Sequence, residues 1–487
     1  MSVQKLPSHS EDFSEWYNEI IMRAELADTP PRVPEQLRGF MVLRPYGYAM
    51  WEHLQAALDG MFKATGHKNA YFPVLIPMSF ISKEKEHVEG FRPELAVVTV
   101  GGGEELAEPL VVRPTSETVI GHMYAQWVRT YRDLPVLINQ WGSVLRWEKR
   151  TRAFLRTAEF LWQEGHTAHA TEEEAEGETL QMLEIYRRAG EEWGAVPLLL
   201  GLKSDTEKFA GAVRTYTIES MMPDGRALQS GTSHNLGQNF AKAFDIQYQD
   251  RDNTLKYAWT TSWGLSWRML GAVIGIHGDD QGLKLPPRLA PIQVVVVPIW
   301  KTEAEQSAVM GAAQQIIASL PKDVRAHLDD RDGLTPGFKF NDWEMRGVPL
   351  RIEIGPKDVD KQQAVVARRD IPGKPSKEFI GWDALPTVVP ERLDAIQANL
   401  FAAARAKMGA MTRTVATYDE FKASIPETGG FGFIRAYWAG DDEDEARVKR
   451  ETGATIRAFP FDQPSEPGRC MLTGKETSRV AVFARAY

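Results

Sequence analysis

The sequence predicts an α+β protein with more than one domain, and three observations lead to this prediction. The chain has 487 residues, too many for one hydrophobic core, so two or three domains are expected. Helix and strand patterns precede a proline-rich stretch at 286–291, and after it strands and helices alternate. Hydrophobic residues form 43% and charged residues 25% of the chain, as in ordinary globular proteins.

The first part of the chain begins its regular structure with an amphipathic helix over 46–62. Its apolar residues recur every three or four positions, and Gly66 can end it. The next segment, "NAYFPVLIP" (69–77), is expected to form a strand, which Pro73 makes an edge or irregular strand. Further strands are expected within 110–118 and 136–148, and a solvated helix with an acidic start over 171–193.

Beyond residue 291 the pattern is that of a compact α/β domain of roughly 100 residues. "IQVVVVPI" predicts a fully buried strand, and Thr302 with Glu305 predicts a capping box for the helix that follows. Two more strands, "VPLRIEI" and "QAVVARR", precede a helix expected to begin near Pro390. From about residue 408 a third, small unit is expected, with the charge run "GDDEDEARVKRE".

Several classes of protein are excluded by composition. No stretch reaches the ~18 uninterrupted apolar residues of a membrane helix, and the polar N-terminus lacks the apolar core of a secretory signal. The single cysteine, Cys470, rules out a disulfide within the chain and a cysteine-rich zinc site. The net charge of -9 argues against general coating of nucleic acid but leaves a local basic surface open. A cytoplasmic location is expected.

Five cations crowd one short stretch, "SVLRWEKRTRAFLRTAEFLWQEGHTAH" (143–169). We expect a hairpin with Arg146 and Glu148 on one arm and Arg156 and Phe160 on the other. Guanidinium groups bind phosphate oxygens, and an aromatic ring gives a base a stacking surface, so the hairpin suits a nucleoside triphosphate. The alternative is a solvated basic loop.

The spacing of these residues resembles motif 2 of class II aminoacyl-tRNA synthetases: an arginine, any residue, a glutamate, then a basic residue four before a phenylalanine. The segment 46–73 is similar to motif 1, a helix and strand ending in proline. Arg268 within "TTSWGLSWRMLGAVIGIHGDDQGLKLPPR" matches the arginine of motif 3. Trp267 stands where many members carry an acidic residue, but this segment is similar to the prolyl branch of the class.

Four further segments, at 113–118, 154–167, 229–248 and 336–358, resemble prolyl-tRNA synthetases of the archaeal and eukaryotic-like architecture. The resemblance covers nearly the whole chain. It implies an antiparallel catalytic sheet flanked by helices, an α/β anticodon-binding domain and a small α+β C-terminal domain. These would occupy residues 1–287, 288–405 and 406–487. The interval 169–257 is too short for the editing insertion of the bacterial architecture, so none is expected.

The resemblance also implies a site for L-proline and ATP, with Arg146 and Arg268 as its catalytic residues. Thr115 and Glu117 would hold the secondary ammonium of proline, and Arg146 would bind its carboxylate and then the α-phosphate. Further expected proline contacts are Trp162, Glu164, His166, His234 and Ser266. Further expected ATP contacts are Glu148, Arg156, Thr157, Phe160, Gln229, Thr232 and, at the γ-phosphate, Arg268.

The implied reaction needs Mg²⁺, for which Glu219 is a candidate ligand, and tRNA(Pro) as the acceptor. Glu344, Arg351 and Lys357 are candidate readers of anticodon bases, because their side chains match base-edge donors and acceptors; a surface salt-bridge array is the alternative. A homodimer without membrane contact is expected.

The C-terminal unit departs from the family. Many relatives bind zinc there through four cysteines, but here Thr473 stands where a partner for Cys470 would complete a cysteine pair. No zinc is therefore expected, and apolar packing is expected to replace it, for instance from Phe431, Phe433, Tyr437, Trp438 and Phe459.

Two alternatives to a proline enzyme remain open. A synthetase for another amino acid, such as threonine, would be expected to hold a catalytic zinc, yet Cys470 lies far from the catalytic region. A module that senses uncharged tRNA would be expected to lack phosphate-binding arginines, yet Arg146, Arg156 and Arg268 are present.

Overall fold

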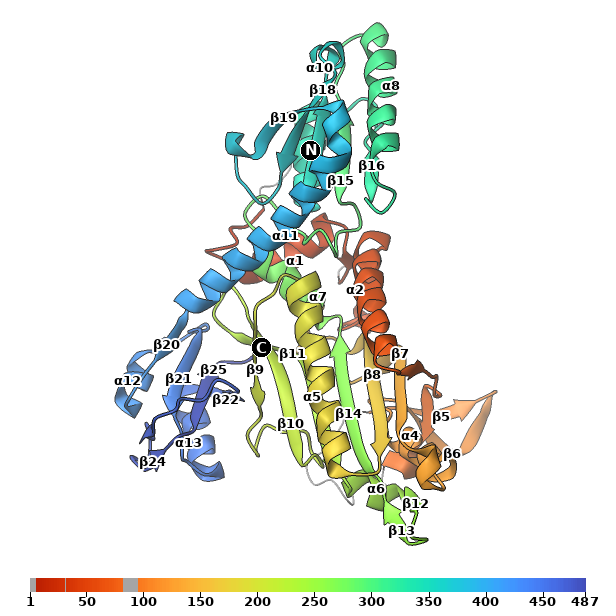
Figure 1. The fold of residues 1–487 in the computed structure, drawn as a ribbon, viewed down its shortest axis with the longest axis vertical. Helices are drawn as coiled ribbons and strands as arrows, with labels where there is room; N and C mark the ends of the chain where they lie inside the picture. The colour runs from red at the N-terminus through yellow and green to blue at the C-terminus, as the bar shows by residue number, and fades with distance from the viewer. Residues whose placement is uncertain (1–5, 31, 82–94) are drawn as a thin grey trace.

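The computed structural model describes residues 6–30, 32–81 and 95–487, and it consists of three connected units (Figure 1). A large antiparallel sheet forms the lower part of the view, an α/β unit stands above it, and the C-terminal strands lie at the side of the sheet. The long helix α11 (Leu385–Ala410) runs from the α/β unit to the C-terminal strands. Within the described ranges, no helix combines the length and apolar character needed to cross a bilayer.

The large sheet supplies the framework of the first unit. Its central strands pair antiparallel in the order β9 (Leu198–Leu202), β10 (Arg214–Met221), β11 (Ala227–Gly237), β14 (Trp259–Ser266), β8 (Glu159–His169) and β7 (Val136–Leu145). One face is covered by α5 (Glu172–Arg188), and nearby lie α2 (Pro45–Ala64) and α7 (Arg268–His277). The core between them contains Trp263, Tyr186 and Phe62, all almost fully buried. The opposite face carries polar side chains such as Glu164, His166 and His234 together with the aromatic residues Phe160 and Trp162.

The predicted strand over 69–77 is wrong in its middle. Only β3 (Lys68–Asn69) and β4 (Leu75–Pro77) are strands, and the residues between them are irregular. The backbone N–H and C=O groups of Phe72 bond to side chains and not to a neighbouring strand. The N–H donates to Gln140 Oε1 at 2.5 Å, and the carbonyl accepts from Arg113 Nη1 at 2.8 Å. Side-chain partners can replace a ladder in this way.

The C-terminal unit continues the large sheet and does not stand apart. Strand β22 (Thr455–Pro460) pairs with β9, placing Phe459 opposite Leu202 and Pro460 opposite Gly201. A Cβ on Gly201 would lie 2.2 Å from the Phe459 carbonyl oxygen, so this approach of two backbones needs glycine. Beyond β22 follow β25 (Val480–Ala484), β21 (Phe433–Tyr437) and β20 (Thr412–Thr414).

Apolar packing surrounds the single cysteine. Cys470 is buried in one cluster with Phe431, Trp438 and Phe459, and the Thr473 N–H lies 3.5 Å from its sulfur. Phe433 packs in a separate cluster, and Tyr437 lies partly buried against Gly468. These buried aromatic side chains contribute much of the hydrophobic stabilisation of this small unit.

The α/β unit has the strand order β16 (Ala326–Leu328), β15 (Val294–Pro298), β17 (Leu350–Ile354), β18 (Gln363–Arg368) and β19 (Lys377–Gly381). The predicted buried strand is confirmed, since every residue of β15 is buried. The capping box of Thr302 and Glu305 at α8 (Glu303–Ser319) is also confirmed. The predicted start of α11 near Pro390 is wrong, because Pro386 already occupies the first turn, where no amide donor is needed.

The remaining elements are smaller. The helices are α1 (Phe13–Arg23), α4 (Glu117–Trp127), α6 (Asn239–Phe244), α9 (Pro336–Met345), α10 (Pro356–Asp360), α12 (Tyr418–Ala423) and α13 (Asp442–Thr452). The strands are β1 (Ala27–Asp28), β2 (Val42–Leu43), β5 (Ala96–Gly101), β6 (Glu104–Val112), β12 (Gln247–Gln249), β13 (Leu255–Tyr257), β23 (Gly468–Arg469) and β24 (Glu476–Thr477).

An ion-pair cluster joins the α/β unit to the first unit. Asp279, just beyond α7, accepts from Arg369 Nη2 at 2.6 Å and Nη1 at 2.9 Å, and Lys284 Nζ lies 2.9 Å away. Burial by itself would raise the pKa of Asp279, but the two cations outweigh burial and lower that pKa to about 2. The carboxylate therefore stays charged in the folded protein at pH values where it is protonated in the unfolded chain.

We expect Asp279→Asn to destabilise the protein at neutral pH by roughly 2.5 kcal/mol, because its folded pKa of about 2 lies about two units below the ordinary value of about 3.9 and each unit is worth about 1.4 kcal/mol. A depressed pKa contributes stability above the unfolded pKa, and the contribution is lost as pH falls from about 4 towards 2. Urea unfolding of both proteins measures this. The difference in free energy of unfolding between wild type and Asp279→Asn should be smaller at pH 3 than at pH 7. An equal difference at the two pH values would contradict the prediction.

Candidate functional site

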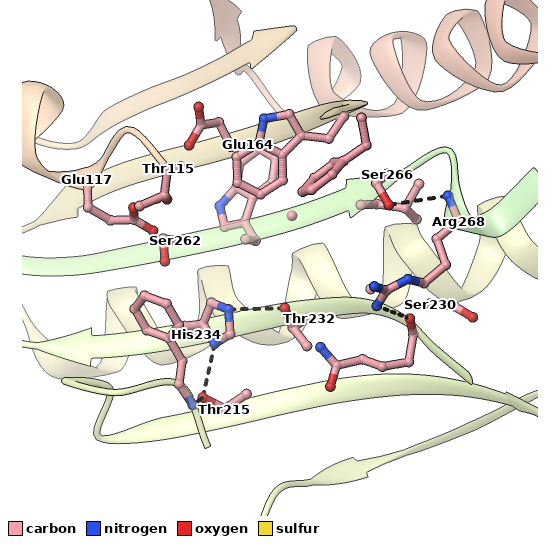
Figure 2. Close-up of a pocket in the computed structure, with 18 of the residues that line it drawn as sticks. Thr115, Glu117, Glu164, Thr215, Ser230, Thr232, His234, Ser262, Ser266 and Arg268 are labelled. Atoms are coloured by element: carbon pink, nitrogen blue, oxygen red, sulfur yellow. Dashed lines mark hydrogen bonds between the residues drawn. The ribbon is translucent and has the colours of Figure 1, made fainter. Parts of the chain in front are cut away.

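A cavity of about 270 Å³ opens on the polar face of the large sheet. Figure 2 shows its lining, drawn from the sheet strands, from the start of α7 and from the loop before α4. It has the carboxylate of Glu117 and several hydroxyls at one end, Arg268 at the other end, and Arg146 between them. Of the residues predicted for the site it gathers Thr115, Glu117, Arg146, Phe160, Trp162, Glu164, His166, Gln229, Thr232, His234, Ser266 and Arg268.

The carboxylate end is built around Glu117, the first residue of α4, whose side chain is buried. The hydroxyl of Thr115 donates to Glu117 Oε2. Ser262 of β14 lies beside them (Figure 2), and in the described part of the chain its buried hydroxyl has no hydrogen-bond partner. A buried carboxylate needs a cationic partner, and an unpaired hydroxyl needs a donor or acceptor, so this end suits a polar ligand with a positive charge.

Glu164 and His166 of β8 form one wall as a buried ion pair, with His166 Nε2 3.0 Å from Glu164 Oε2. Glu164 also accepts from the Ser116 backbone N–H at 3.2 Å, from the Ser116 hydroxyl, and from Gln140 Nε2 at 2.8 Å. Burial opposes charge on both groups, but their mutual contact prevails: the pKa of Glu164 is lowered and that of His166 is raised. The carboxylate of Glu164 is thus already satisfied, which leaves Glu117 to meet a ligand's cation.

His234 of β11 is held neutral on the opposite wall. Thr215 Oγ1 lies 3.0 Å from its Nδ1 and Thr232 Oγ1 lies 3.1 Å from its Nε2 (Figure 2). Burial, helped by the charge of His166, lowers the pKa of His234 to about 3. The ring of Phe209 lies 4.7 Å from the His234 ring, centroid to centroid. A neutral imidazole and a phenyl ring offer an apolar surface that does not repel a bound cation.

Arg146 lies at the junction of the two ends, directly after β7. Its backbone N–H donates to the Ala158 carbonyl at 2.7 Å, and its Nε donates to the Pro114 carbonyl at 3.0 Å. Its guanidinium lies 5.4 Å from the Phe160 ring centroid and 5.6 Å from that of Trp162. Burial lowers the pKa of Arg146, and the carboxylates of Glu117 and Glu164 oppose that shift.

Arg268, the first residue of α7, forms the far end of the cavity. Its Nε donates to the Leu155 carbonyl at 2.8 Å, and its Nη1 donates to the Gln229 carbonyl at 3.2 Å (Figure 2). Burial and then the repulsion of Arg146 lower the pKa of Arg268 to about 10, so it remains charged at neutral pH. Two desolvated guanidinium groups that repel each other create a strong site for an anion that fits between them.

Three predicted ATP contacts lie outside this cavity. Strand β7 ends at Leu145 and β8 begins at Glu159, so Glu148 and Arg156 are in the connecting loop and not on the arms of the hairpin. Arg156 points outwards with its side chain 52% exposed and pairs with Glu148 at 2.8 Å. Thr157 is buried and lines a separate cavity near α1. The assumption that strand alternation continued through this stretch was wrong.

The suggestion that Glu219 binds magnesium needs correction. Glu219 is fully buried on β10, and its carboxylate accepts from Lys203 Nζ at 2.8 Å and from Arg457 Nη2 at 3.0 Å. Burial would raise the pKa of Glu219, but these two cations lower it. A carboxylate enclosed by two cations has no free oxygen for a metal ion.

Several residues that line the cavity were not predicted from the sequence. Glu207, Lys208 and Phe209 line the cavity from the loop between β9 and β10, and Thr215 and Ser262 line it from the sheet. The two strand residues alternate with buried apolar positions and so carried a usable signal. The loop residues lacked any periodic pattern. Their only sequence signal is a charged pair followed by an aromatic residue, which is common on surfaces.

A second cavity, of about 340 Å³, lies in the α/β unit and contains two of the three predicted anticodon readers, Glu344 and Arg351. Arg351 Nη1 lies 2.8 Å from Glu344 Oε1, and its guanidinium stacks 4.1 Å from the Phe340 ring centroid. Lys357, on α10, is not among the residues that line this cavity. The remaining lining is rich in cations, including Arg368, Arg369 and Lys377, as phosphate or base recognition requires.

Comparison with known protein families divides the chain in three. The tRNA synthetase class II core domain (G, H, P, S and T) matches residues 99–277, the anticodon binding domain matches 293–392, and the prolyl-tRNA synthetase C-terminal family matches 418–487. The chain is 57% identical over its whole length to a proline--tRNA ligase of Roseiflexus sp., all of which it covers. It is 54% identical to a chloroplastic/mitochondrial proline--tRNA ligase of Arabidopsis thaliana, again over the whole chain and 89% of the relative. It is 52% identical over full length to a proline--tRNA ligase of Chlorobium chlorochromatii.

Proposed function

The chain belongs to the proline--tRNA ligase family, and from that premise we propose how its cavity activates proline with ATP and charges tRNA(Pro). The observation that carries the proposal is the meeting of Glu117, Arg146 and Arg268 in one cavity, although they come from distant parts of the sequence. The carboxylate end would hold the secondary ammonium of proline, and the arginine end would hold the triphosphate.

At the proline end, Glu117 and Thr115 would bind the substrate nitrogen, and Ser262 would offer its unpaired hydroxyl. The pyrrolidine ring would lie against Phe209 and neutral His234, with Trp162 and the Glu164–His166 pair as the other wall. Phe160 would stack on adenine, and Gln229 and Thr232 would meet the nucleotide. Ser266, predicted to contact proline, accepts from the Arg268 backbone N–H at 3.2 Å and would meet the nucleotide instead. Arg156 and Glu148 would join the site only through movement of their loop.

The chemistry needs no covalent enzyme nucleophile. A carboxylate oxygen of proline attacks the α-phosphorus of ATP in line, the bond to the bridging oxygen breaks, and pyrophosphate leaves. Arg146 would stabilise the charge at the α-phosphate and orient the proline carboxylate, while Arg268 would hold the γ-phosphate of the leaving group. The terminal ribose hydroxyl of tRNA then attacks the activated carbonyl, and AMP leaves.

We propose Mg²⁺ as the accompanying ion. It would neutralise phosphate charge when bound, and it commonly keeps several waters and takes few protein ligands. Two donors that fit such a site are the side-chain oxygens of Gln229 and Thr232, which line the cavity.

The wider assembly is also a proposal. We assign residues 1–287 to catalysis, 288–405 to anticodon binding and 406–487 to a C-terminal domain, with Glu344, Arg351 and Lys357 reading anticodon bases. A homodimer is supported by exposed apolar side chains after α2, namely Tyr71, Val74 and Leu75, which are 74%, 40% and 37% exposed. A cytoplasmic location agrees with a single, unpaired cysteine.

ATP–pyrophosphate exchange across the amino acids tests the proposal. We expect exchange that depends on proline and that does not require tRNA, because the cavity holds both reacting groups without it. Exchange dependent on threonine or another amino acid, or no exchange with any, would contradict the assignment of the cavity.

A further inference from the structure

The loop between β9 and β10 forms one wall of the cavity, and its outer side contacts the C-terminal unit. Glu207, Lys208 and Phe209 face the cavity from this loop, and Phe209 packs on His234. Within the loop, the N–H groups of Glu207 and Lys208 donate to the Ser204 carbonyl at 3.2 and 2.9 Å, and towards β10 the Phe209 N–H donates to Thr215 Oγ1 at 3.0 Å. These bonds shape the loop and join its inner side to β10, while its outer side is open to contacts from another part of the chain.

The C-terminal unit makes those outer contacts. The Ser204 hydroxyl donates to Glu445 Oε1 of α13 at 2.8 Å, and both side chains are almost fully buried. Glu207 Oε2 lies 3.7 Å from Arg457 Nη1 of β22, and Glu207 Oε1 lies 3.7 Å from Lys449 Nζ of α13. Three side chains from residues 445–457 thus reach a loop that is more than 200 positions earlier in the chain.

The base of the loop is fixed by the same unit. Lys203, the residue before Ser204, contacts Glu219, and Arg457 binds Glu219 through Nε at 3.1 Å and Nη2 at 3.0 Å. All three side chains are buried, and Arg457 Nη1 is held in turn by Thr455 Oγ1 at 2.9 Å. A buried charged cluster tolerates little displacement, because moving one partner leaves another unpaired. Arg457 therefore ties the loop base and Glu207 to one rigid strand.

We propose that the C-terminal unit positions the proline-binding wall, with Glu445 and Arg457 as positioning residues that hold residues 203–209 against the cavity. Neither touches the substrates; they act through Ser204, Glu207 and Phe209. The inference rests on the proposed function, because it assigns Phe209 to the proline ring. It gives the C-terminal unit a part in proline affinity and selectivity besides its contribution to folding.

The test compares Glu445→Ala with Glu445→Gln in the full-length protein. Alanine removes the acceptor of the Ser204 hydroxyl, whereas glutamine keeps an acceptor oxygen. We expect Glu445→Ala to raise the KM for proline in ATP–pyrophosphate exchange on the order of 10-fold, with kcat and the KM for ATP changed less than about 2-fold. Glu445→Gln should restore the KM for proline to near the wild-type value, and discrimination between proline and alanine should fall only in Glu445→Ala.

Two further variants keep the test decisive. Ser204→Ala removes the donor of the same hydrogen bond, so it should also raise the KM for proline. In the double variant with Glu445→Ala, the KM for proline should be little higher than in Glu445→Ala alone. Glu443→Ala, an exposed position on the same helix, is the control and should leave all parameters unchanged. If thermal unfolding shows Glu445→Ala to be unfolded, Ser204→Ala alone decides the result.

The outcomes separate the two claims. Proline-dependent exchange in the wild type, with an unchanged KM in both Glu445→Ala and Ser204→Ala, would overturn the positioning inference and leave the proposed function intact. Equal losses in Glu445→Ala and Glu445→Gln, or losses in kcat alone, would also overturn it. Absence of proline-dependent exchange in the wild type would overturn the proposed function and this inference together.

Discussion

Arg146→Gln is expected to lower kcat/KM for proline-dependent ATP–pyrophosphate exchange by about 100- to 1,000-fold, the usual loss when one positioned donor to a developing charge is removed. Arg146 lies where the carboxylate end and the arginine end of the cavity meet. Glutamine keeps a hydrogen-bond donor but lacks the charge and the forked geometry that match a carboxylate or phosphate. Steady-state exchange and the equilibrium affinity for tRNA together measure the effect.

The control for this variant is Arg150→Gln, an exposed position in the same loop, for which exchange should be unchanged. tRNA affinity should be retained by Arg146→Gln, because the side chain faces the interior of the cavity. Loss of tRNA binding with exchange intact would show that Arg146 serves the acceptor and not the activation step.

Glu117→Gln is expected to raise the KM for proline roughly 30- to 1,000-fold, because truncating one partner of a buried charge pair is costly. Glu164 cannot substitute, since its carboxylate is already held by Ser116, Gln140 and His166. The KM for ATP should change little, because Glu117 lies at the end of the cavity away from Arg268 (Figure 2). Exchange kinetics at varied proline and varied ATP measure both constants.

A proline analogue with oxygen in place of the ring nitrogen provides the matched comparison. Tetrahydrofuran-2-carboxylate carries no cation, so as a competitive inhibitor it should bind Glu117→Gln at least as well as the wild type. A loss of affinity for this analogue equal to the loss for proline would mean that Glu117 shapes the cavity and does not pair with the substrate nitrogen.

The sequence allowed the cavity's two ends to be predicted because their residues belong to distinctive local patterns. Arg146 and Phe160 flank a cationic loop, and Arg268 begins a helix directly after a strand. Such patterns fix which side chain sits at the end of which element. The expectation that these residues share one cavity with Glu117 agrees with the structure.

Other features depended on contacts between distant residues, and no local pattern encodes these. Strand β22 pairs with β9 across more than 250 positions, so the sequence predicted a third, small unit but not that this unit extends the large sheet. Glu219 was misjudged for the same reason, because its partner Arg457 comes from that unit. Arg156 was misplaced because β7 ends at Leu145, and the loop beyond it does not keep strand alternation.

The most direct measurement of the central claim is a crystal structure with a non-hydrolysable prolyl-adenylate analogue. We expect the pyrrolidine ring against Phe209 and His234 with its nitrogen on Glu117, the acyl-phosphate mimic on Arg146, and adenine against Phe160. An analogue bound elsewhere, or bound in this cavity with its prolyl group directed towards Arg268, would contradict the account.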